Sequence, residues 1–285
     1  NYAFIFGKFG APRMEIAGAA LGTLLARTSE FLVTFGYILF KDKELGLRIK
    51  HLLHMPGKEF FSNYLRLGLP VLVSDGLLGL GGNIVSIILG HMGAAVVAAN
   101  AICQVIDRLF TVMIQGISNA SSIVTGHTLG EGSREKAMQQ GYTFYVLSIF
   151  FGLIAAVMVL ACGPLTIAMY SLNAETILMT EEMMGAYAVI VFFQCIQSVM
   201  TKGVLRGGGD TRFLMKADIL FMWLVSIPLG GVGGLLLGWP AWLTILALRV
   251  DFAIKSVWCI HRLKSGKWIH TADGIAEAEP AGAEG

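Results

Sequence analysis

The sequence has little charge. Only 14% of its 285 residues are Asp, Glu, Lys or Arg, whereas 55% are apolar, and the mean hydropathy is +0.69. Soluble globular domains usually have about a quarter of their residues charged. A chain of this length and composition must bury its apolar surface in lipid. This excludes an ordinary soluble domain and predicts a polytopic membrane protein.

Cysteine is also scarce, and the signatures of soluble enzymes are missing. The sequence contains no phosphate-binding loop, no zinc motif and no nucleophile elbow. Its cysteines have neither metal-ligand nor disulfide spacing, so we expect small core residues at Cys103, Cys162, Cys195 and Cys259. We therefore predict a protein that is not an enzyme, that has no cofactor and that does not bind nucleic acid.

Long apolar segments dominate the chain instead. Seven of them are long enough to cross a bilayer as helices: Ile16–Phe40, Leu67–Leu89, Ala94–Thr125, Tyr142–Cys162, Met183–Leu205, Ala217–Leu237 and Ala241–His261. The predicted fold class is therefore all-α, with seven transmembrane helices embedded in the lipid bilayer.

Basic residues are concentrated in every second loop between the predicted spans. Of the 21 Lys and Arg residues, 15 fall in one set of alternating loops, and only Lys8 and Arg13 fall in the opposite set. Loops rich in Lys and Arg stay in the cytoplasm. We therefore expect a multi-pass protein of the cell inner membrane, with Asn1 outside and the C-terminus in the cytoplasm.

One polar stripe follows the helix predicted over Ala94–Thr125. Its members are three or four residues apart and therefore share a helical face: Asn100, Gln104, Asp107, Thr111, Gln115, Ser118 and Ser122. A carboxylate at membrane depth is costly unless it is paired or wetted. We interpret the stripe as the lining of a solute pathway; the alternative is a packing seam, since small polar residues also join membrane helices.

Two other helices carry candidate pathway residues. One face of Leu67–Leu89 presents Asp75 and Asn83, and one side of Met183–Leu205 presents Tyr187, Gln194 and Gln197. Amide and aromatic side chains together suit a cavity for bulky, partly apolar solutes, although packing residues look similar.

Two pairs of opposite charge lie within predicted spans. Arg27 and Glu30 are three residues apart, and Asp251 and Lys255 are four apart, so each pair is expected to form a structural ion pair. The alternative for Lys255 is to extend its ammonium group to the nearby cytoplasmic surface.

Two loop motifs resemble the signatures of one family. The segment Lys202–Arg212, KGVLRGGGDTR, resembles the cytoplasmic motif of the multidrug and toxic compound extrusion (MATE) transporters. The segment Gly126–Gly132, GHTLGEG, resembles the other MATE signature, and Ile117–Ala120 and Phe4–Gly7 fit as well. The resemblance extends from Asn1 to about Trp268.

MATE transporters have two six-helix lobes, so the resemblance also implies a domain organisation. Residues 1–40 correspond to the last helix of a first lobe, 41–63 to a cytoplasmic linker and 64–268 to a second lobe. Residues 269–285 are expected to be a disordered tail. We expect the remainder of the first lobe to belong to a longer protein and to be missing from this chain.

The function implied by the resemblance is antiport by alternating access, in which small cationic or amphipathic compounds leave the cell in exchange for Na⁺ or H⁺. The motif would form a tight basic turn at the inner surface, with Arg206, Gly207, Gly209, Asp210 and Arg212. One Na⁺-coupled branch has a glutamate and an aspartate where this chain has Leu78 and Gln197. The candidate ion ligands here are therefore Asp75 and Asp107, unless the ion site lies in the first lobe.

Two alternative functions remain open. The first is a flippase for lipid-linked oligosaccharides from the same wider superfamily, which the two glycine motifs disfavour. The second is a seven-helix receptor, suggested by Lys255 in the last helix, but this lysine lies too near the cytoplasmic end for a Schiff base at mid-membrane.

Overall fold

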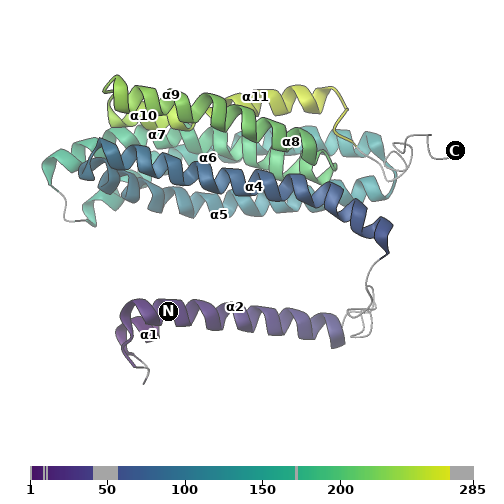
Figure 1. Ribbon diagram of the computed structural model, residues 1–285, viewed down its shortest axis with the longest axis horizontal. Coiled ribbons are helices and arrows are strands. Elements are labelled where there is room, and N and C mark those ends of the chain that lie inside the picture. The colour runs from purple at the N-terminus through teal and green to yellow at the C-terminus, as the bar shows by residue number, and fades with distance from the viewer. Residues whose placement is uncertain (1, 9, 11, 41–56, 171–172, 270–285) are drawn as a thin grey trace. The chain divides into compact units, whose positions relative to one another are not determined.

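A computed structural model describes residues 2–8, 10, 12–40, 57–170 and 173–269 (Figure 1). Every regular element in these ranges is a helix, which confirms the predicted all-α fold class. The residues at 41–56 and 270–285, most of the predicted linker and tail, lie outside this description. The chain divides into two compact units, Asn1–Asn63 and Tyr64–Gly285.

The first unit contains the helices α1 (Tyr2–Phe6) and α2 (Glu15–Phe40). The backbone N–H of Met14 donates to the Phe4 carbonyl at 2.9 Å, and Gly18 lets the two helices approach closely, because a Cβ atom there would collide with the same carbonyl. Arg27 and Glu30 are 2.7 Å apart, which confirms the predicted ion pair.

The second unit is a bundle of long helices. Its elements are α4 (Lys58–Met92, which belongs to this unit from Tyr64 onward), α5 (Ala94–Gly130), α6 (Arg134–Ala168), α7 (Ala174–Ser198), η1 (Val199–Leu205), α8 (Thr211–Asp218), η2 (Ile219–Ser226), α9 (Ile227–Gly231), η3 (Val232–Leu236), α10 (Ala241–Leu248) and α11 (Val250–Lys264). The elements labelled η are π-helical turns, which are common at functional sites. They continue the α-helices before them without a break.

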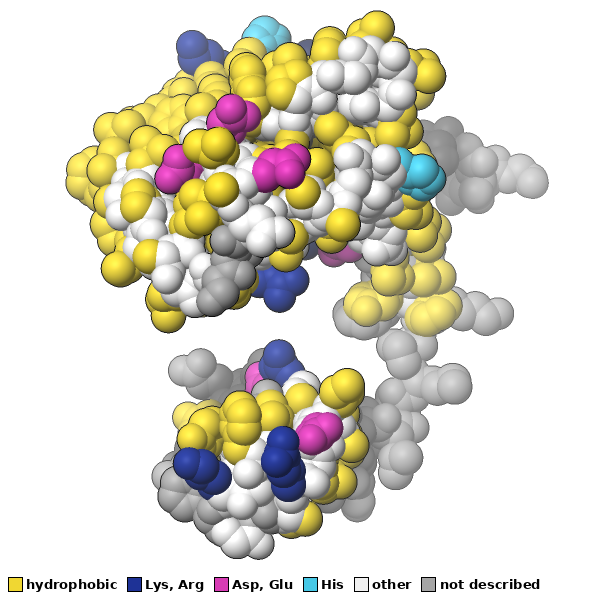
Figure 2. All heavy atoms as spheres, turned by 90° about the vertical axis from the view of Figure 1, so that its left-hand side faces the viewer, with side chains coloured by type: hydrophobic (Ala, Val, Ile, Leu, Met, Phe, Trp, Pro, Cys, Tyr) yellow, Lys and Arg dark blue, Asp and Glu magenta, His cyan; other side chains and the backbone are white. Residues whose placement is uncertain are grey.

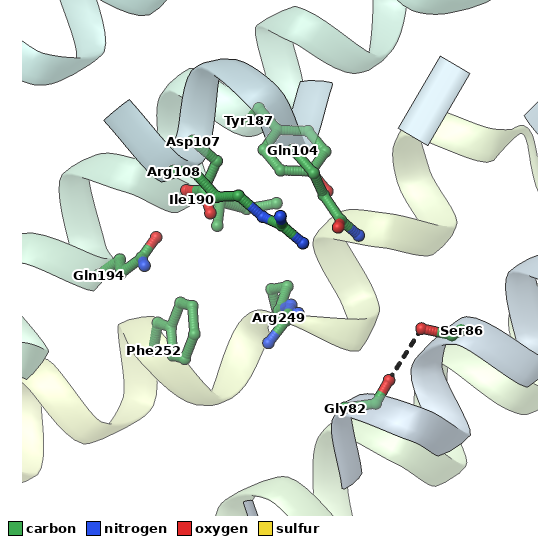
Figure 3. Close-up of a pocket in the computed structure, with 10 residues that line it drawn as sticks. All are labelled: Gly82, Ser86, Gln104, Asp107, Arg108, Tyr187, Ile190, Gln194, Arg249 and Phe252. Atoms are coloured by element: carbon green, nitrogen blue, oxygen red, sulfur yellow. Dashed lines mark hydrogen bonds between the residues drawn. The ribbon is translucent and has the colours of Figure 1, made fainter. Parts of the chain in front are cut away.

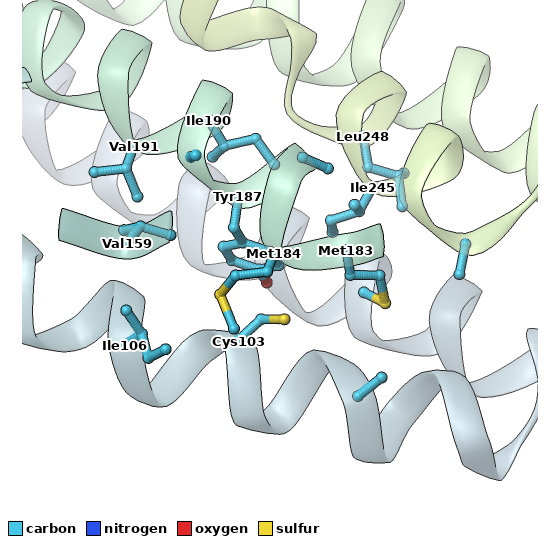
Figure 4. Close-up of a cluster of buried hydrophobic side chains, with 14 of the residues drawn as sticks. Cys103, Ile106, Val159, Met183, Met184, Tyr187, Ile190, Val191, Ile245 and Leu248 are labelled. Atoms are coloured by element: carbon cyan, nitrogen blue, oxygen red, sulfur yellow. The ribbon is translucent and has the colours of Figure 1, made fainter. Parts of the chain in front are cut away.

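The core of this unit is built around α7. This helix packs against α5, α6, α10 and α11. Figure 4 shows Met183, Met184 and Tyr187 of α7 between Cys103 of α5 and Ile245 of α10, all of them buried. The outer surface is apolar, and Figure 2 shows hydrophobic side chains over much of the visible surface of the larger unit. An apolar core inside an apolar surface is the arrangement expected in lipid.

Six helices are long and apolar enough to cross a membrane among the described residues. They correspond to the first six predicted spans, and most of the helices extend several residues beyond the predicted bounds, although the sixth ends at Leu236, one residue early. The prediction of a single helix over Ala241–His261 is wrong. The chain leaves helical geometry at Arg249 (φ −121°, ψ 10°), between α10 and α11.

The break at Arg249 is stabilised by a neighbouring hydroxyl group. The break leaves the backbone N–H of Asp251 without a partner in its own helix, and this N–H donates to Ser226 Oγ of η2 at 2.8 Å. In lipid a backbone donor without a partner costs several kcal/mol, so an interrupted helix needs such a partner. Neither Pro nor Gly lies at residues 247–251 to signal the break in the sequence.

Glycines of the KGVLRGGGDTR motif bring η1 against α5. A Cβ atom at Gly203 would collide with Ser121 Oγ, and one at Gly207 would lie 2.7 Å from the Ser122 carbonyl oxygen. A Cβ atom at Gly208 would collide with the ring of Trp268, which is fully buried. The motif glycines therefore make room for a helix on one side and an indole ring on the other.

Candidate functional site

The polar stripe of α5 is packed at its ends and open in its middle. Near one end, Asn100 accepts a hydrogen bond from the Tyr187 hydroxyl at 2.7 Å, and near the other, Ser118 Oγ donates to the Ser198 carbonyl at 2.9 Å. Both residues are buried. Between them, Gln104, Asp107 and Thr111 border cavities. The packing alternative therefore describes the ends of the stripe, and a wetted lining is possible only in its centre.

A polar cavity of about 240 Å³, which we call the Asp107 cavity, lies beside this centre (Figure 3). Four segments supply its lining: α4, α5, α7 and the start of α11 with the residue before it. The lining residues are Gly82, Ser86, Gln104, Asp107, Arg108, Tyr187, Ile190, Gln194, Arg249 and Phe252. Four of the predicted pathway residues, Gln104, Asp107, Tyr187 and Gln194, thus come together in one cavity.

A second cavity of about 170 Å³, the Gln197 cavity, adjoins the first, because Gln194, Arg249 and Phe252 line both. It also contains the predicted pathway residues Gln115 and Gln197. Its amides are held in place: Gln194 Nε2 donates to Thr111 Oγ1 at 3.2 Å, and Gln197 Nε2 donates to Thr201 Oγ1 at 3.0 Å.

The structure separates Asp75 and Asn83 from these cavities. Both side chains are exposed on α4, and neither lines the Asp107 or the Gln197 cavity. Instead, Asp75 Oδ1 lies 3.2 Å from a guanidinium nitrogen of Arg206 in the KGVLRGGGDTR motif. Among the residues that can be described, no group of three His, Cys, Asp or Glu side chains is placed to hold a metal ion.

The motif forms a turn between η1 and α8. Gly209 has a positive φ of 84°, a conformation that favours glycine, and Asp210 precedes the first residue of α8. Arg262 Nε donates to Asp210 Oδ2 at 2.7 Å, which links this turn to α11. Arg212 is exposed. The motif arginines thus differ in role, because Arg206 binds α4 whereas Arg212 faces outward.

A buried charge cluster links α4, α8, η2 and α11. Lys255 Nζ lies 2.8 Å from Asp218 Oδ1 and 3.0 Å from Asp251 Oδ2, which confirms the predicted Asp251–Lys255 pair. Ser74 Oγ donates to Asp218, and Ser226 Oγ donates to Asp251 at 3.3 Å. The alternative in which Lys255 extends to the surface is wrong, because its side chain is 0% exposed. Asp218 was not predicted, because it stands at the start of a predicted span, where a surface carboxylate is ordinary.

Three further cations that line the cavities, Arg108, Arg249 and Lys202, were also not predicted from the sequence. In the part of the chain that the structure describes, none of them forms an ion pair. A signal existed for Arg249, since an arginine near the middle of an apolar span needs a polar surrounding.

Comparison with known proteins identifies the family. Residues 70–232, over half of the chain, match the family model MatE. The chain belongs to the MATE family. This is a family of transporters and not of enzymes, which confirms the prediction of a non-enzymatic, multi-pass membrane protein and leaves no support for a seven-helix receptor.

Relatives and solved structures agree with this assignment. The chain is 28% identical over 235 residues to the multidrug resistance protein MdtK of Photorhabdus laumondii, covering 82% of this chain and 51% of that protein. It is 26% identical to MdtK of Yersinia pseudotuberculosis over the same length. The chain therefore spans about half the length of the curated relatives it matches.

The fold matches solved MATE transporters. A crystal structure of MATE in complex with MaL6 superimposes with a TM-score of 0.77 at 17% identity, covering 93% of this chain and 59% of the other. An outward-facing multidrug resistance MATE transporter of the MOP superfamily gives a TM-score of 0.75 at 20% identity, with the same coverage.

Proposed function

We propose that this MATE chain forms the second lobe of a secondary active exporter, which moves small amphipathic compounds out of the cell in exchange for Na⁺ or H⁺. The observation that carries the proposal is the Asp107 cavity: a polar space of about 240 Å³ inside a helix bundle whose outer surface is apolar. Ionisable residues at membrane depth that face a cavity typically mark solute pathways. The name of the MdtK relatives, multidrug resistance proteins, supports export in particular.

The lining of the cavity supports an amphipathic substrate. Ile190 and the rings of Tyr187 and Phe252 offer apolar contact, while Gln104 and Gln194 offer amide donors and acceptors. Such mixed linings orient a bulky solute through a few polar contacts. The resemblance implies small cationic or amphipathic compounds, and this lining supports the amphipathic class.

A carboxylate in the pathway is the natural site for the coupling cation. We propose Asp107, because it faces the cavity and its Oδ1 atom is buried without a hydrogen-bond partner among the described residues. Asp75, the other candidate, is already engaged by Arg206 and is better suited to a role at the motif.

The remaining length of the MATE relatives supports a first lobe that completes the pathway. In alternating access, the two lobes rock about a central site, which opens to each side in turn. The basic motif residues Arg206 and Arg212 support a cytoplasmic location for the motif and for the C-terminus.

Transport in proteoliposomes tests this proposal. The intact protein is reconstituted, and efflux of amphipathic dyes of either charge is followed under an imposed Na⁺ or pH gradient. We expect one gradient to drive efflux, and Asp107→Asn to abolish the coupling without reducing insertion. Glu182→Gln, an exposed carboxylate of α7 that lines neither polar cavity, is the matched control. Efflux that responds to neither gradient would overturn the proposal.

A further inference from the structure

We propose that the substrate carries an anionic group, such as a carboxylate, sulfonate or phosphate, and that Arg249 and Arg108 bind this group in the Asp107 cavity. This inference rests on the proposed function and adds the chemical class of the substrate.

The balance of charge around the cavity favours an anion. The Asp107 cavity is lined by two arginines, Arg108 and Arg249, but by only one carboxylate, Asp107. In the adjoining Gln197 cavity, Lys255 is paired with two carboxylates, Asp218 and Asp251, so this cluster carries one net negative charge, whereas the exposed Lys202 has no ion-pair partner among the described residues. The described lining thus carries an excess of positive charge.

The two arginines also border the same space. Figure 3 shows the side chains of Arg108, from α5, and Arg249, from the α10–α11 break, extending into the same space. Arg249 also stacks over the ring of Phe252, with 5.5 Å from its Cζ atom to the ring centroid. A guanidinium group has planar, paired donors that match a carboxylate, sulfonate or phosphate.

An anion would lower the energetic cost of this arrangement. An unpaired cation at membrane depth is costly, and two nearby cations also repel each other. Asp107 lines the same cavity as both arginines but forms an ion pair with neither among the described residues. An anionic group between the guanidinium groups relieves both costs, whereas a cationic group adds a further repulsion.

The apolar part of such an anion has a place as well. Arg249 and Ile190 also line an apolar cavity of about 320 Å³, to which Phe193, Trp239 and Leu243 contribute. An anion attached to an aromatic or aliphatic body fits this arrangement better than a small hydrophilic anion, because only the former buries apolar surface.

An anionic substrate changes how coupling must work. An anion and a cation attract each other, so Na⁺ or H⁺ at Asp107 cannot expel an anionic substrate by direct competition. Exchange must then arise because the cation and the substrate stabilise different arrangements of the lobes.

Two probes with the same ring and opposite charge test the proposal. Binding of radiolabelled naphthalene sulfonate and of naphthyl trimethylammonium to the purified intact protein is measured by equilibrium dialysis. We expect the sulfonate to bind more tightly, and Arg249→Gln to weaken its binding about tenfold or more, the effect of losing a charged hydrogen bond. Arg249→Lys should retain part of the affinity, and Lys216→Gln, an exposed cation of α8, should retain all of it.

The Asp107→Asn variant distinguishes the two classes of substrate most clearly. Removing this carboxylate should tighten the binding of an anion and weaken the binding of a cation. It should strengthen sulfonate binding by removing a negative charge beside Arg249, and this holds even if Arg249→Gln fails to fold. Two results would overturn the inference. The first is tighter binding of the ammonium probe than of the sulfonate by the unsubstituted protein, and the second is sulfonate binding that is unchanged in Arg249→Gln. Ion-coupled efflux of the ammonium probe alone would overturn it while leaving the proposed function intact.

A lipid headgroup could supply the same chemistry. The equilibrium dialysis of the sulfonate is therefore repeated in micelles with added phosphatidylglycerol or phosphatidylcholine. Displacement of the sulfonate by phosphatidylglycerol alone identifies a lipid phosphate as the bound anion, and sulfonate binding unaffected by either lipid identifies a soluble anion. Binding of neither naphthyl probe contradicts the proposal.

Discussion

The ammonium group of Lys255 lies 2.8 Å from the carboxylate of Asp218, and the lysine side chain has no exposed surface. This contact joins α11 to α8, and Asp251 completes the cluster from the same helix as the lysine. Buried ion pairs are weak evidence for net stability, yet removing one partner is strongly destabilising, because it leaves an uncompensated charge in the interior.

Lys255→Met should therefore destabilise the lobe. Two buried carboxylates would remain without their counter-ion, which should lower the free energy of unfolding by about 3–5 kcal/mol. Thermal unfolding of the purified protein in detergent measures the change. Lys264→Met, an exposed lysine at the end of the same helix, should have little effect.

The same cluster predicts a rescue. Replacing Asp218 and Asp251 by Asn in the Lys255→Met background removes the buried charges altogether and should recover most of the lost stability. A triple variant no more stable than Lys255→Met would show that the lysine acts through its packing and not through its charge.

Gly203→Ala should also destabilise, for a steric reason. The added Cβ atom would collide with Ser121 Oγ of α5, and overpacking of this kind typically costs about 1–3 kcal/mol. Gly116→Ala is the matched control, because nothing lies within 4 Å of a Cβ atom at that helical position. Equal unfolding temperatures for the two variants would contradict the close approach of η1 to α5.

Asp75 and Arg206 offer a charge-exchange experiment. Their pair is partly exposed, so Asp75→Asn should change stability by less than about 1 kcal/mol. It should nevertheless slow export, if the link between α4 and the motif participates in the movement of the lobe. The double variant Asp75→Arg/Arg206→Asp should restore part of the transport rate. If Asp75 instead binds the coupling cation, the exchanged pair will remain inactive.

Periodicity in the sequence located the helices and the polar face of α5. It could not tell which residues of that face pack against neighbouring helices and which line a cavity. Asn100 and Gln104 are one turn apart and chemically alike, yet Asn100 is buried beneath the Tyr187 hydroxyl and Gln104 borders the Asp107 cavity. That difference depends on where α7 crosses α5, which is a tertiary relationship.

The cations that line the cavities show a second feature that the sequence alone could not predict. The break at Arg249 depends on a hydroxyl group from η2, more than twenty residues away in the chain, so local sequence carries no sign of it. Without the break, Arg249 reads as an isolated charge in a span. Asp75 shows the converse, since a pattern on one helix suggested a pathway residue whose partner, Arg206, lies 131 residues away.

Transport through the Asp107 cavity requires that the cavity is wet in the membrane, and thiol labelling tests this central claim most directly. The free cysteines of the chain are first replaced: Cys103, Cys162, Cys195 and Cys259. A single cysteine is then placed either at Gln104, in the cavity, or at the next residue, Val105. Val105 lines neither polar cavity and is exposed on the apolar surface. Thiols react as thiolates, which require water. A membrane-impermeant maleimide should label Gln104→Cys rapidly in one orientation of the transporter and leave Val105→Cys unlabelled. Equally slow labelling at both positions, in open membranes accessible from both sides, would contradict the account.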